Sequence, residues 1–222
     1  MTDRPRPELP LPCIMLVTDR RRCGERRLDE IVGAAVEGGV NVVQVREKDL
    51  PSGELFDLVS RLVSVVGTRA LVMVNERLDV ALAARADGVQ LPGDALPTEA
   101  ARALASELLV GRSVHDVAPG AAAATRGADL LLVGTMFPSQ SHPGIPPAGP
   151  SLLRKLAGMV SVPLVGIGGI TTANAAQVIG AGASGVAVIS EILEALDPRE
   201  AAARLASAVH GAWPTAPLHK RH

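Results

Sequence analysis

The stretches Val165-Gly166-Ile167-Gly168-Gly169-Ile170 and Gly185-Val186-Ala187-Val188-Ile189-Ser190 decide the fold of this chain of 222 residues. Each begins as an apolar, β-branched run typical of a buried strand, and each ends in glycine or serine before a helix-compatible segment. Backbone N–H groups at such junctions attract anions, and the last two strands of a βα-repeat barrel commonly end in this way around a phosphate. The two stretches therefore predict a barrel that binds a phosphorylated ligand. The predicted phosphate-binding residues are Gly168, Gly169, Ile189 and Ser190.

Similar apolar runs alternate with amphipathic, alanine- and leucine-rich stretches along the whole chain. The predicted strands are residues 14–18, 42–46, 71–75, 88–91, 108–112, 130–134, 164–168 and 185–189, and the predicted helices include 28–37, 53–66, 97–107, 151–159, 172–181 and 198–210. Strand ends recur at roughly 24-residue intervals, the length of one βα unit. The pattern predicts an α/β protein with a single (β/α)8 TIM barrel. The alternative is a doubly wound open sheet, which more typically carries a glycine fingerprint where this chain reads Val17-Thr18-Asp19-Arg20.

The predicted barrel domain covers residues 11–211, with a disordered N-terminal tail at 1–10 and a disordered C-terminal tail at 212–222. The connection over residues 135–150, after the sixth predicted strand, is long and rich in glycine and proline. Long connections of this kind in compact domains usually carry function. We therefore interpret it as a lid over an active site.

The composition excludes several classes of protein. The 22 basic and 23 acidic residues give a net charge of -1, so nothing attracts the chain electrostatically to nucleic acid or to an anionic membrane. With two phenylalanines, one tryptophan and no tyrosine, a base-stacking platform is not expected. Cys13 and Cys23 do not make a disulfide framework, and no apolar run resembles a signal peptide or a membrane span. We expect a cytoplasmic protein that binds neither nucleic acid nor membrane.

Polar residues follow the predicted strands, and in a barrel these strand ends meet on one face. The candidates for substrate binding there are Gln44, Arg46, Asn75 and Ser113, with Met136 from the long connection. His115, just past the fifth predicted strand, is the candidate catalytic residue because histidine exchanges protons near neutral pH. Structural roles stay open: Arg46 pairing with a nearby glutamate, Gln44 hydrogen-bonding within the barrel, and His115 supporting a helix end.

With these segments in hand, the chain resembles the thiamine phosphate synthase and thiazole tautomerase superfamily over about residues 14–209. The segments that carry the resemblance are Leu16-Val17-Thr18-Asp19, Val43-Gln44-Val45-Arg46-Glu47-Lys48, Val72-Met73-Val74-Asn75, Ala86-Asp87-Gly88-Val89-Gln90-Leu91, Gly111-Arg112-Ser113-Val114-His115 and the two opening stretches. Their occurrence in this order is a specific signal, whereas any one of them alone is weak.

The chain departs from the synthase pattern at three places. Asn75-Glu76 stands where the synthase pattern has Asn-Asp. In Gln90-Leu91-Pro92-Gly93-Asp94-Ala95, an alanine takes the position of a metal-binding acid. Ser139-Gln140-Ser141-His142 replaces the Thr-x-Thr-Lys that grips pyrophosphate in synthases. These departures favour the tautomerase branch.

The resemblance then implies a thiazole tautomerase of thiamine biosynthesis, an isomerase that converts a dearomatised thiazole carboxylate phosphate to its aromatic tautomer. His115 would move the proton, Arg46 would bind the carboxylate, and no cofactor is needed. One alternative is a divergent synthase that joins hydroxymethylpyrimidine pyrophosphate to thiazole phosphate, with Glu76 and Asp94 as ligands of Mg²⁺. The other is a non-catalytic barrel that binds thiazole or thiamine phosphate. The expected partner is a small phosphorylated thiazole, and the sequence leaves open whether the protein forms a homodimer.

Overall fold

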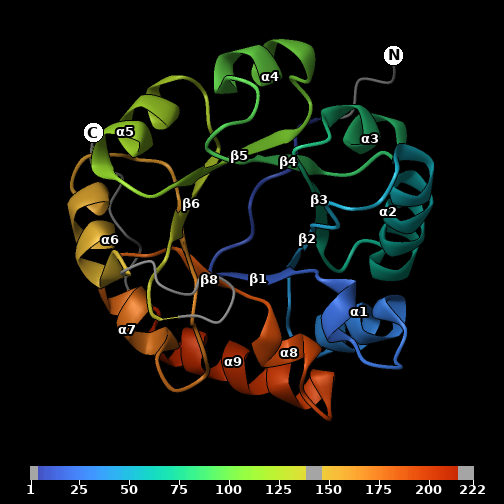
Figure 1. The fold of residues 1–222 in the computed structure, drawn as a ribbon. Coiled ribbons are helices and arrows are strands. Elements are labelled where there is room, and N and C mark those ends of the chain that lie inside the picture. The colour runs from blue at the N-terminus through green and yellow to red at the C-terminus, as the bar shows by residue number, and fades with distance from the viewer. Residues whose placement is uncertain (1–4, 139–146, 215–222) are drawn as a thin grey trace.

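The computed structural model describes residues 5–138 and 147–214 and shows eight parallel strands that close into a barrel inside a ring of helices (Figure 1). The strands are β1 (Cys13–Val17), β2 (Val42–Val45), β3 (Leu71–Asn75), β4 (Gly88–Leu91), β5 (Leu109–Val114), β6 (Leu130–Gly134), β7 (Leu164–Ile167) and β8 (Gly185–Val188). The described helices are η1 (Arg20–Arg22), α1 (Leu28–Glu37), α2 (Ser52–Val66), α3 (Leu78–Ala83), α4 (Thr98–Leu104), α5 (Val117–Thr125), α6 (Gly149–Ala157), α7 (Ala175–Gly180), α8 (Ser190–Leu193) and α9 (Pro198–Ala212). The single (β/α)8 barrel predicted from the sequence is confirmed, and the open-sheet alternative is wrong.

Each strand pairs in parallel with its sequence neighbours, and β1 closes the ring against β8. Met15 lies opposite Val42 on β2 and opposite Ala187 on β8. Because the strands are parallel, their carboxyl ends all open on one face of the barrel. Residues far apart in the sequence therefore meet there.

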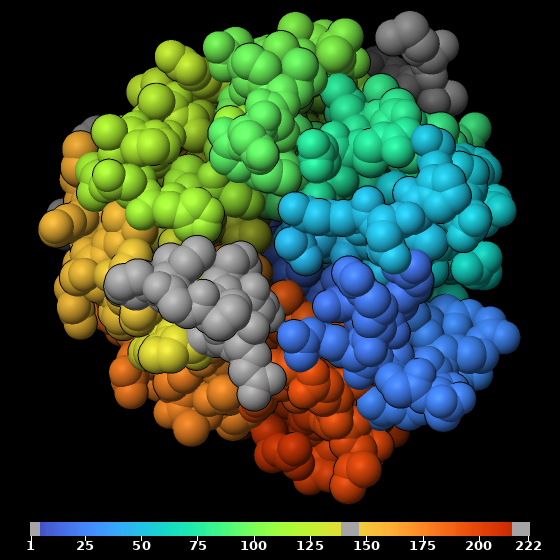
Figure 2. Space-filling model, viewed as in Figure 1, coloured from blue at the N-terminus to red at the C-terminus, as the bar shows by residue number. Residues whose placement is uncertain are grey.

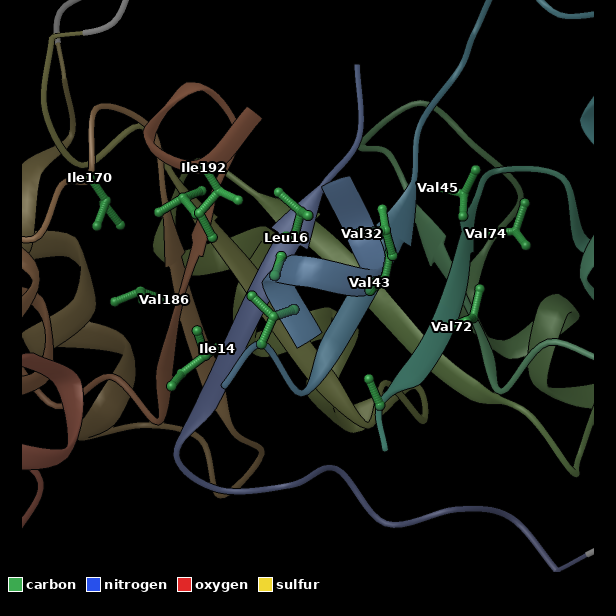
Figure 3. Close-up of a cluster of buried hydrophobic side chains, with 14 of the residues drawn as sticks. Ile14, Leu16, Val32, Val43, Val45, Val72, Val74, Ile170, Val186 and Ile192 are labelled. Carbon is green, nitrogen blue, oxygen red and sulfur yellow. The ribbon is translucent and has the colours of Figure 1, made fainter. Parts of the chain in front are cut away.

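Two apolar layers follow from the alternation of side chains along each strand. Cys13, Met15 and Val17 belong to a cluster made of strand residues that fills the barrel interior. Ile14 and Leu16 point the other way and pack with helix residues, as Figure 3 shows for Val32 of α1 and Ile192 of α8. Burial of both faces explains why these strands are continuous apolar runs rather than alternating ones.

Three short helices were missing from the sequence prediction: α3, α5 and α8. In α5, six of nine residues are alanine or glycine, so no polar face contrasts with an apolar one. Asp116 caps that helix, its carboxylate accepting a hydrogen bond from the Val117 N–H at 2.6 Å. The helix therefore depends on its cap and on tertiary packing more than on amphipathic periodicity.

Residues 5–10, which the sequence assigned to a tail, lie against the barrel. Leu9 packs against the interior cluster, and Arg6 forms a 3.1 Å ion pair with Asp129. Among the described residues, no helix combines the length and apolar character that crossing a bilayer requires.

Candidate active site

A cavity of about 500 Å³ opens at the carboxyl ends of the strands, and Figure 2 shows the hollow near the centre of this face. All eight strands or the loops after them contribute to its wall. The polar and loop residues that line it include Asp19, Arg22, Gln44, Arg46, Lys48, Asn75, Asp94, Ser113, His115, Gly168, Gly169, Ile189 and Ser190. The floor is apolar and aliphatic, with Val17, Leu132 and Ala187 from the barrel interior.

The β7 side of the cavity depends on two glycines with positive φ, Gly168 at +100° and Gly169 at +62°. A Cβ atom on Gly168 would lie 2.4 Å from Cγ2 of Thr135, and one on Gly169 would lie 2.5 Å from the Pro138 carbonyl oxygen. Both the backbone conformation and the close approach of the loop after β6 therefore require glycine. The result is a bare stretch of backbone facing the cavity.

Two side chains outside the cavity wall fix this stretch. Asn174 donates from Nδ2 to the Gly169 carbonyl at 2.9 Å and accepts from the Thr171 N–H at 2.8 Å. Glu191 accepts from the backbone N–H and the hydroxyl of Thr172, at 2.9 and 2.8 Å. The loops after β7 and β8 are thereby joined, which holds Gly168, Gly169, Ile189 and Ser190 on one side of the cavity.

Basic side chains gather on the β1–β2 side of the cavity. Arg46 and Lys48 follow β2, and Arg22 comes from η1 after β1. Arg22 forms ion pairs with Asp19 and Glu194. Within the described ranges, no ion pair is recorded for Arg46 or Lys48. Their charges are thus available to an anionic ligand.

Pairs of polar side chains link neighbouring strands. Gln44 on β2 donates to Oδ1 of Asn75 on β3 at 3.2 Å, and Gln90 on β4 donates to the Ser113 hydroxyl on β5 at 3.0 Å. In the part of the chain that the structure describes, the Oε1 atoms of both glutamines are buried without a hydrogen-bond partner. Gln44 lines the cavity, although its Oε1 atom is buried within the wall. The hydrogen bond within the barrel that was considered for Gln44 is thus present in the structure.

His115 lies on the rim of the cavity, where its Nδ1 is 2.8 Å from the Gly134 carbonyl oxygen. A carbonyl only accepts hydrogen bonds, so Nδ1 carries a proton here. In the neutral imidazole, Nε2 is then the acceptor.

The two carboxylates considered for a metal differ in position. Asp94 lines the cavity, whereas Glu76 is exposed, has a φ of +64° and is not part of the wall. Ala95 packs against the apolar cluster of Val89, Leu91, Ala101 and Val110. No group of three or more metal-ligating side chains occurs in the part of the chain that the structure describes. Mg²⁺ is commonly held by one or two carboxylates together with substrate phosphates and water, and Asp94 fits that pattern.

The comparison with known proteins decides the family. The family described as thiamine monophosphate synthase matches residues 14–192. The chain belongs to this family. It is 44% identical over 199 residues to the thiamine-phosphate synthase of Roseiflexus sp. (strain RS-1), covering 88% of this chain and 84% of that one. It is also 44% identical over 202 residues to the thiamine-phosphate synthase of Haloarcula marismortui, covering 88% of this chain and 96% of that one.

A solved structure supports the same family. Thiamine phosphate pyrophosphorylase from Pyrococcus furiosus superposes with a TM-score of 0.84 at 36% identity, over 91% of this chain and 97% of that one. The superfamily predicted from the sequence is therefore confirmed.

The choice of branch was wrong. Relatives at this level of identity are named synthases, so the tautomerase function and the isomerase class are withdrawn. The mistake came from giving too much weight to the carboxylate missing at Ala95. Since substrate phosphates and water supply most ligands of Mg²⁺ in many enzymes, the loss of one carboxylate does not exclude such chemistry.

The structure brings most of the predicted site residues together around one cavity. The exceptions are Glu76, which is outside the wall, and Met136, which is buried in the outer core near Gly166 and does not line the cavity. Alternation from Leu130 and Leu132, which face the barrel interior, would place Met136 inside as well, but its side chain lies in the outer core while its N–H donates to the Ile167 carbonyl. The segment Ser139-Gln140-Ser141-His142 and the centre of the expected lid lie outside the described residues.

Sequence reasoning left Lys48 and Arg22 out of the predicted site, although both line the cavity. Lys48 carried a usable signal because it follows a predicted strand two positions after Arg46. Arg22 carried none, since its place depends on the 3-10 turn of η1.

Proposed function

We propose that this protein is a thiamine-phosphate synthase, a transferase that joins hydroxymethylpyrimidine pyrophosphate to thiazole phosphate and releases pyrophosphate. In this reaction a bond forms between the thiazole nitrogen and the pyrimidine methylene carbon. The bond from that carbon to the pyrophosphate oxygen breaks, and its electron pair leaves with pyrophosphate. The observation that carries the proposal is a single cavity with two different anion-binding sides, one of bare backbone and one of basic side chains. Two phosphorylated substrates need two such sides.

The backbone side suits the phosphate of the thiazole substrate. Gly168 and Gly169 place main-chain groups at the cavity wall without side chains, and Ile189 and Ser190 line the same side. Main-chain N–H groups in loops of this kind are effective phosphate ligands. Asn174 and Glu191 hold the loops in place, so the side is organised before the ligand arrives.

The basic side suits the pyrophosphate. Arg46 and Lys48 would stabilise the charge that develops on the leaving oxygen as the C–O bond breaks. Their guanidinium and ammonium groups act on a charge that is larger in the transition state than in the bound substrate. This difference is what accelerates a reaction.

Mg²⁺ is implied by the synthase reaction, and Asp94 is the cavity residue that would hold it, with Glu76 as a second candidate. When bound, the ion would neutralise part of the charge on the leaving pyrophosphate. Arg112 fixes the loop that carries Asp94, donating to the carbonyl oxygens of Gly93 and Leu96 at 2.8 Å each. The carboxylate is thereby presented at the cavity mouth.

The remaining polar residues would orient the two rings over the aliphatic floor. Gln44, Asn75 and Ser113 line the cavity and would offer polar contacts to the ring nitrogens and amino group. His115 would present Nε2 to the substrates from the rim. We retain these as binding residues and assign no proton transfer to His115.

The test is formation of thiamine phosphate from the two substrates by the purified protein, with and without Mg²⁺. We expect product, and we expect K48M to raise the KM for the pyrimidine substrate by roughly tenfold, the value of one charge-assisted contact. K155M is the matched control, because Lys155 is exposed on α6 outside the cavity. Absence of product from folded protein with both substrates and Mg²⁺ would contradict the proposal.

A further inference from the structure

The carboxylate of Glu47 is buried between two residues that face the cavity. Its side chain is 1% exposed, while Arg46 and Lys48 on either side line the cavity wall. A buried carboxylate is costly unless hydrogen bonds and an opposite charge compensate it. The contacts that compensate Glu47 therefore show what its burial achieves.

Among the residues that the structure describes, every hydrogen bond to this carboxylate comes from Arg20, which follows the neighbouring strand β1. The Arg20 N–H donates to Oε1 at 3.1 Å and to Oε2 at 3.2 Å, and Nη1 of Arg20 donates to Oε2 at 3.0 Å. Arg20 directly follows Asp19, which lines the cavity. One carboxylate thus fastens the loop after β2 to the loop after β1.

A second link lies one residue earlier in the same loop. The hydroxyl oxygen of Thr18, which is fully buried, accepts from the Arg46 N–H at 3.0 Å. Together with the Glu47 contacts, it fixes the backbone on both sides of the Arg46 carbonyl. The directions in which Arg46 and Lys48 leave the backbone are set by these two links.

The hydrogen bonds between Arg20 and Glu47, here called the clamp, also determine which charges near the cavity remain unpaired. Arg20 binds both Glu47 and Asp49, with its guanidinium 2.7 and 2.8 Å from the two Asp49 oxygens. These hydrogen bonds hold the pKa of Asp49 down at about 2. Since Glu47 is occupied by Arg20, it does not neutralise the basic residues beside it.

We infer that Glu47, clamped by Arg20, is a positioning residue that directs Arg46 and Lys48 toward the pyrophosphate side of the cavity. The inference rests on the proposed function for the identity of the anion. Glu47 itself does not line the cavity and acts through its two neighbours.

The direction of the effect in E47Q separates positioning from simple electrostatics. Removing a negative charge next to an anion site would by charge alone strengthen binding of the anion. If the carboxylate positions the basic residues, binding becomes weaker instead. D49N is the matched control, because Asp49 pairs with the same guanidinium but is 44% exposed and makes no contact with the Arg20 backbone N–H in the structure.

The experiment is titration calorimetry with inorganic pyrophosphate and with thiazole phosphate, alongside thermal unfolding. We expect E47Q to weaken pyrophosphate binding by roughly tenfold, as expected for a lost charge-assisted contact. The affinity of E47Q for thiazole phosphate should stay near the wild-type value. The affinity of D49N for pyrophosphate should also stay near the wild-type value. R20M removes the other half of the clamp, should show the same loss, and replaces E47Q if that variant does not fold. The double variant R20M/E47Q should bind pyrophosphate no more weakly than either single variant, because both substitutions break the same interaction.

The inference is overturned if E47Q binds pyrophosphate as tightly as the wild type or more tightly. It is equally overturned if D49N loses as much, or if both ligands lose affinity in parallel. Synthase turnover of the wild type is measured separately. A protein with no turnover but with selective loss of pyrophosphate binding in E47Q would refute the proposed function and leave the positioning role standing.

Discussion

Replacement of Gly168 by alanine is the sharpest test of the cavity geometry. The residue has a φ of +100°, and an added Cβ would lie 2.4 Å from Cγ2 and 3.1 Å from Cα of Thr135. The second distance involves backbone, so a side-chain rotation cannot relieve the overlap. Either the turn after β7 or the loop after β6 has to move.

The size of the effect follows from two contributions. A left-handed backbone costs an alanine about 1–2 kcal/mol, and forcing an extra methyl group into packed surroundings costs about 1–3 kcal/mol more. The free energy of unfolding should therefore fall by roughly 2–5 kcal/mol. For a chain of this size that lowers Tm by roughly 4–20 °C.

Thermal and urea unfolding measure this loss, and the KM for thiazole phosphate reports the functional part. G53A is the matched control, because Gly53 lies in the first turn of α2 and an added Cβ meets nothing within 4 Å. Alanine there should stabilise the protein by up to about 1 kcal/mol. If G168A is as stable as the wild type and binds thiazole phosphate equally well, the reasoning about this turn is wrong.

Three further predictions concern other groups. Burial raises the pKa of the Cys13 thiol to about 12 and also raises the pKa of the Cys23 thiol. Both thiols should therefore resist alkylation in native protein at mildly alkaline pH and react in urea-unfolded protein, and rapid labelling of native protein would contradict the structure. Hydrogen bonds from Arg20 lower the pKa of Asp49 from 3.8 to about 2, so the stability that Asp49 contributes is present above pH 3.8 and is lost as pH falls toward 2. The free energies of unfolding of wild type and D49N in urea should therefore differ at neutral pH and become equal near pH 2. Q90M removes a buried oxygen without a partner among the described residues, and it also removes the hydrogen bond from Nε2 to Ser113, so the two effects oppose each other and the free energy of unfolding in urea should change by less than about 1 kcal/mol. A larger loss would show that the hydrogen bonds of Gln90 stabilise the fold by more than its unpaired oxygen costs.

Much of the fold could be predicted because the barrel strands are buried on both faces. Val42, Val43 and Val45 illustrate a run whose β-branched side chains suit either layer, and runs of this kind identified all eight strands to within two residues at each end. Helices such as α3 and α8 are too short to show a period, with six and four residues. Their existence depends on the neighbouring strands rather than on their own pattern.

The candidate site could be predicted only as far as the face on which it lies. The ends of the strands bring the backbones of Gln44, Ser113 and Gly168 to one face of the barrel, independently of the directions of their side chains. Side-chain direction is decided by packing, which is why Met136 points into the outer core and why the clamp between Arg20 and Glu47 gave no sequence signal. The branch of the family could not be read from missing carboxylates, because substrate oxygens can replace protein ligands of Mg²⁺.

Because β1 pairs with β8, the cavity is complete only after both strands have been synthesised. Asp19, Arg46 and Lys48 come from the first strands to leave a ribosome, whereas Ile189 and Ser190 come from the last. The two proposed anion-binding sides therefore share no cavity until β8 has paired with β1. A ligand that contacts both sides should stabilise the pairing of β1 with β8. Its presence should therefore slow amide exchange in β1 and β8 more than in β4 and β5 on the opposite wall.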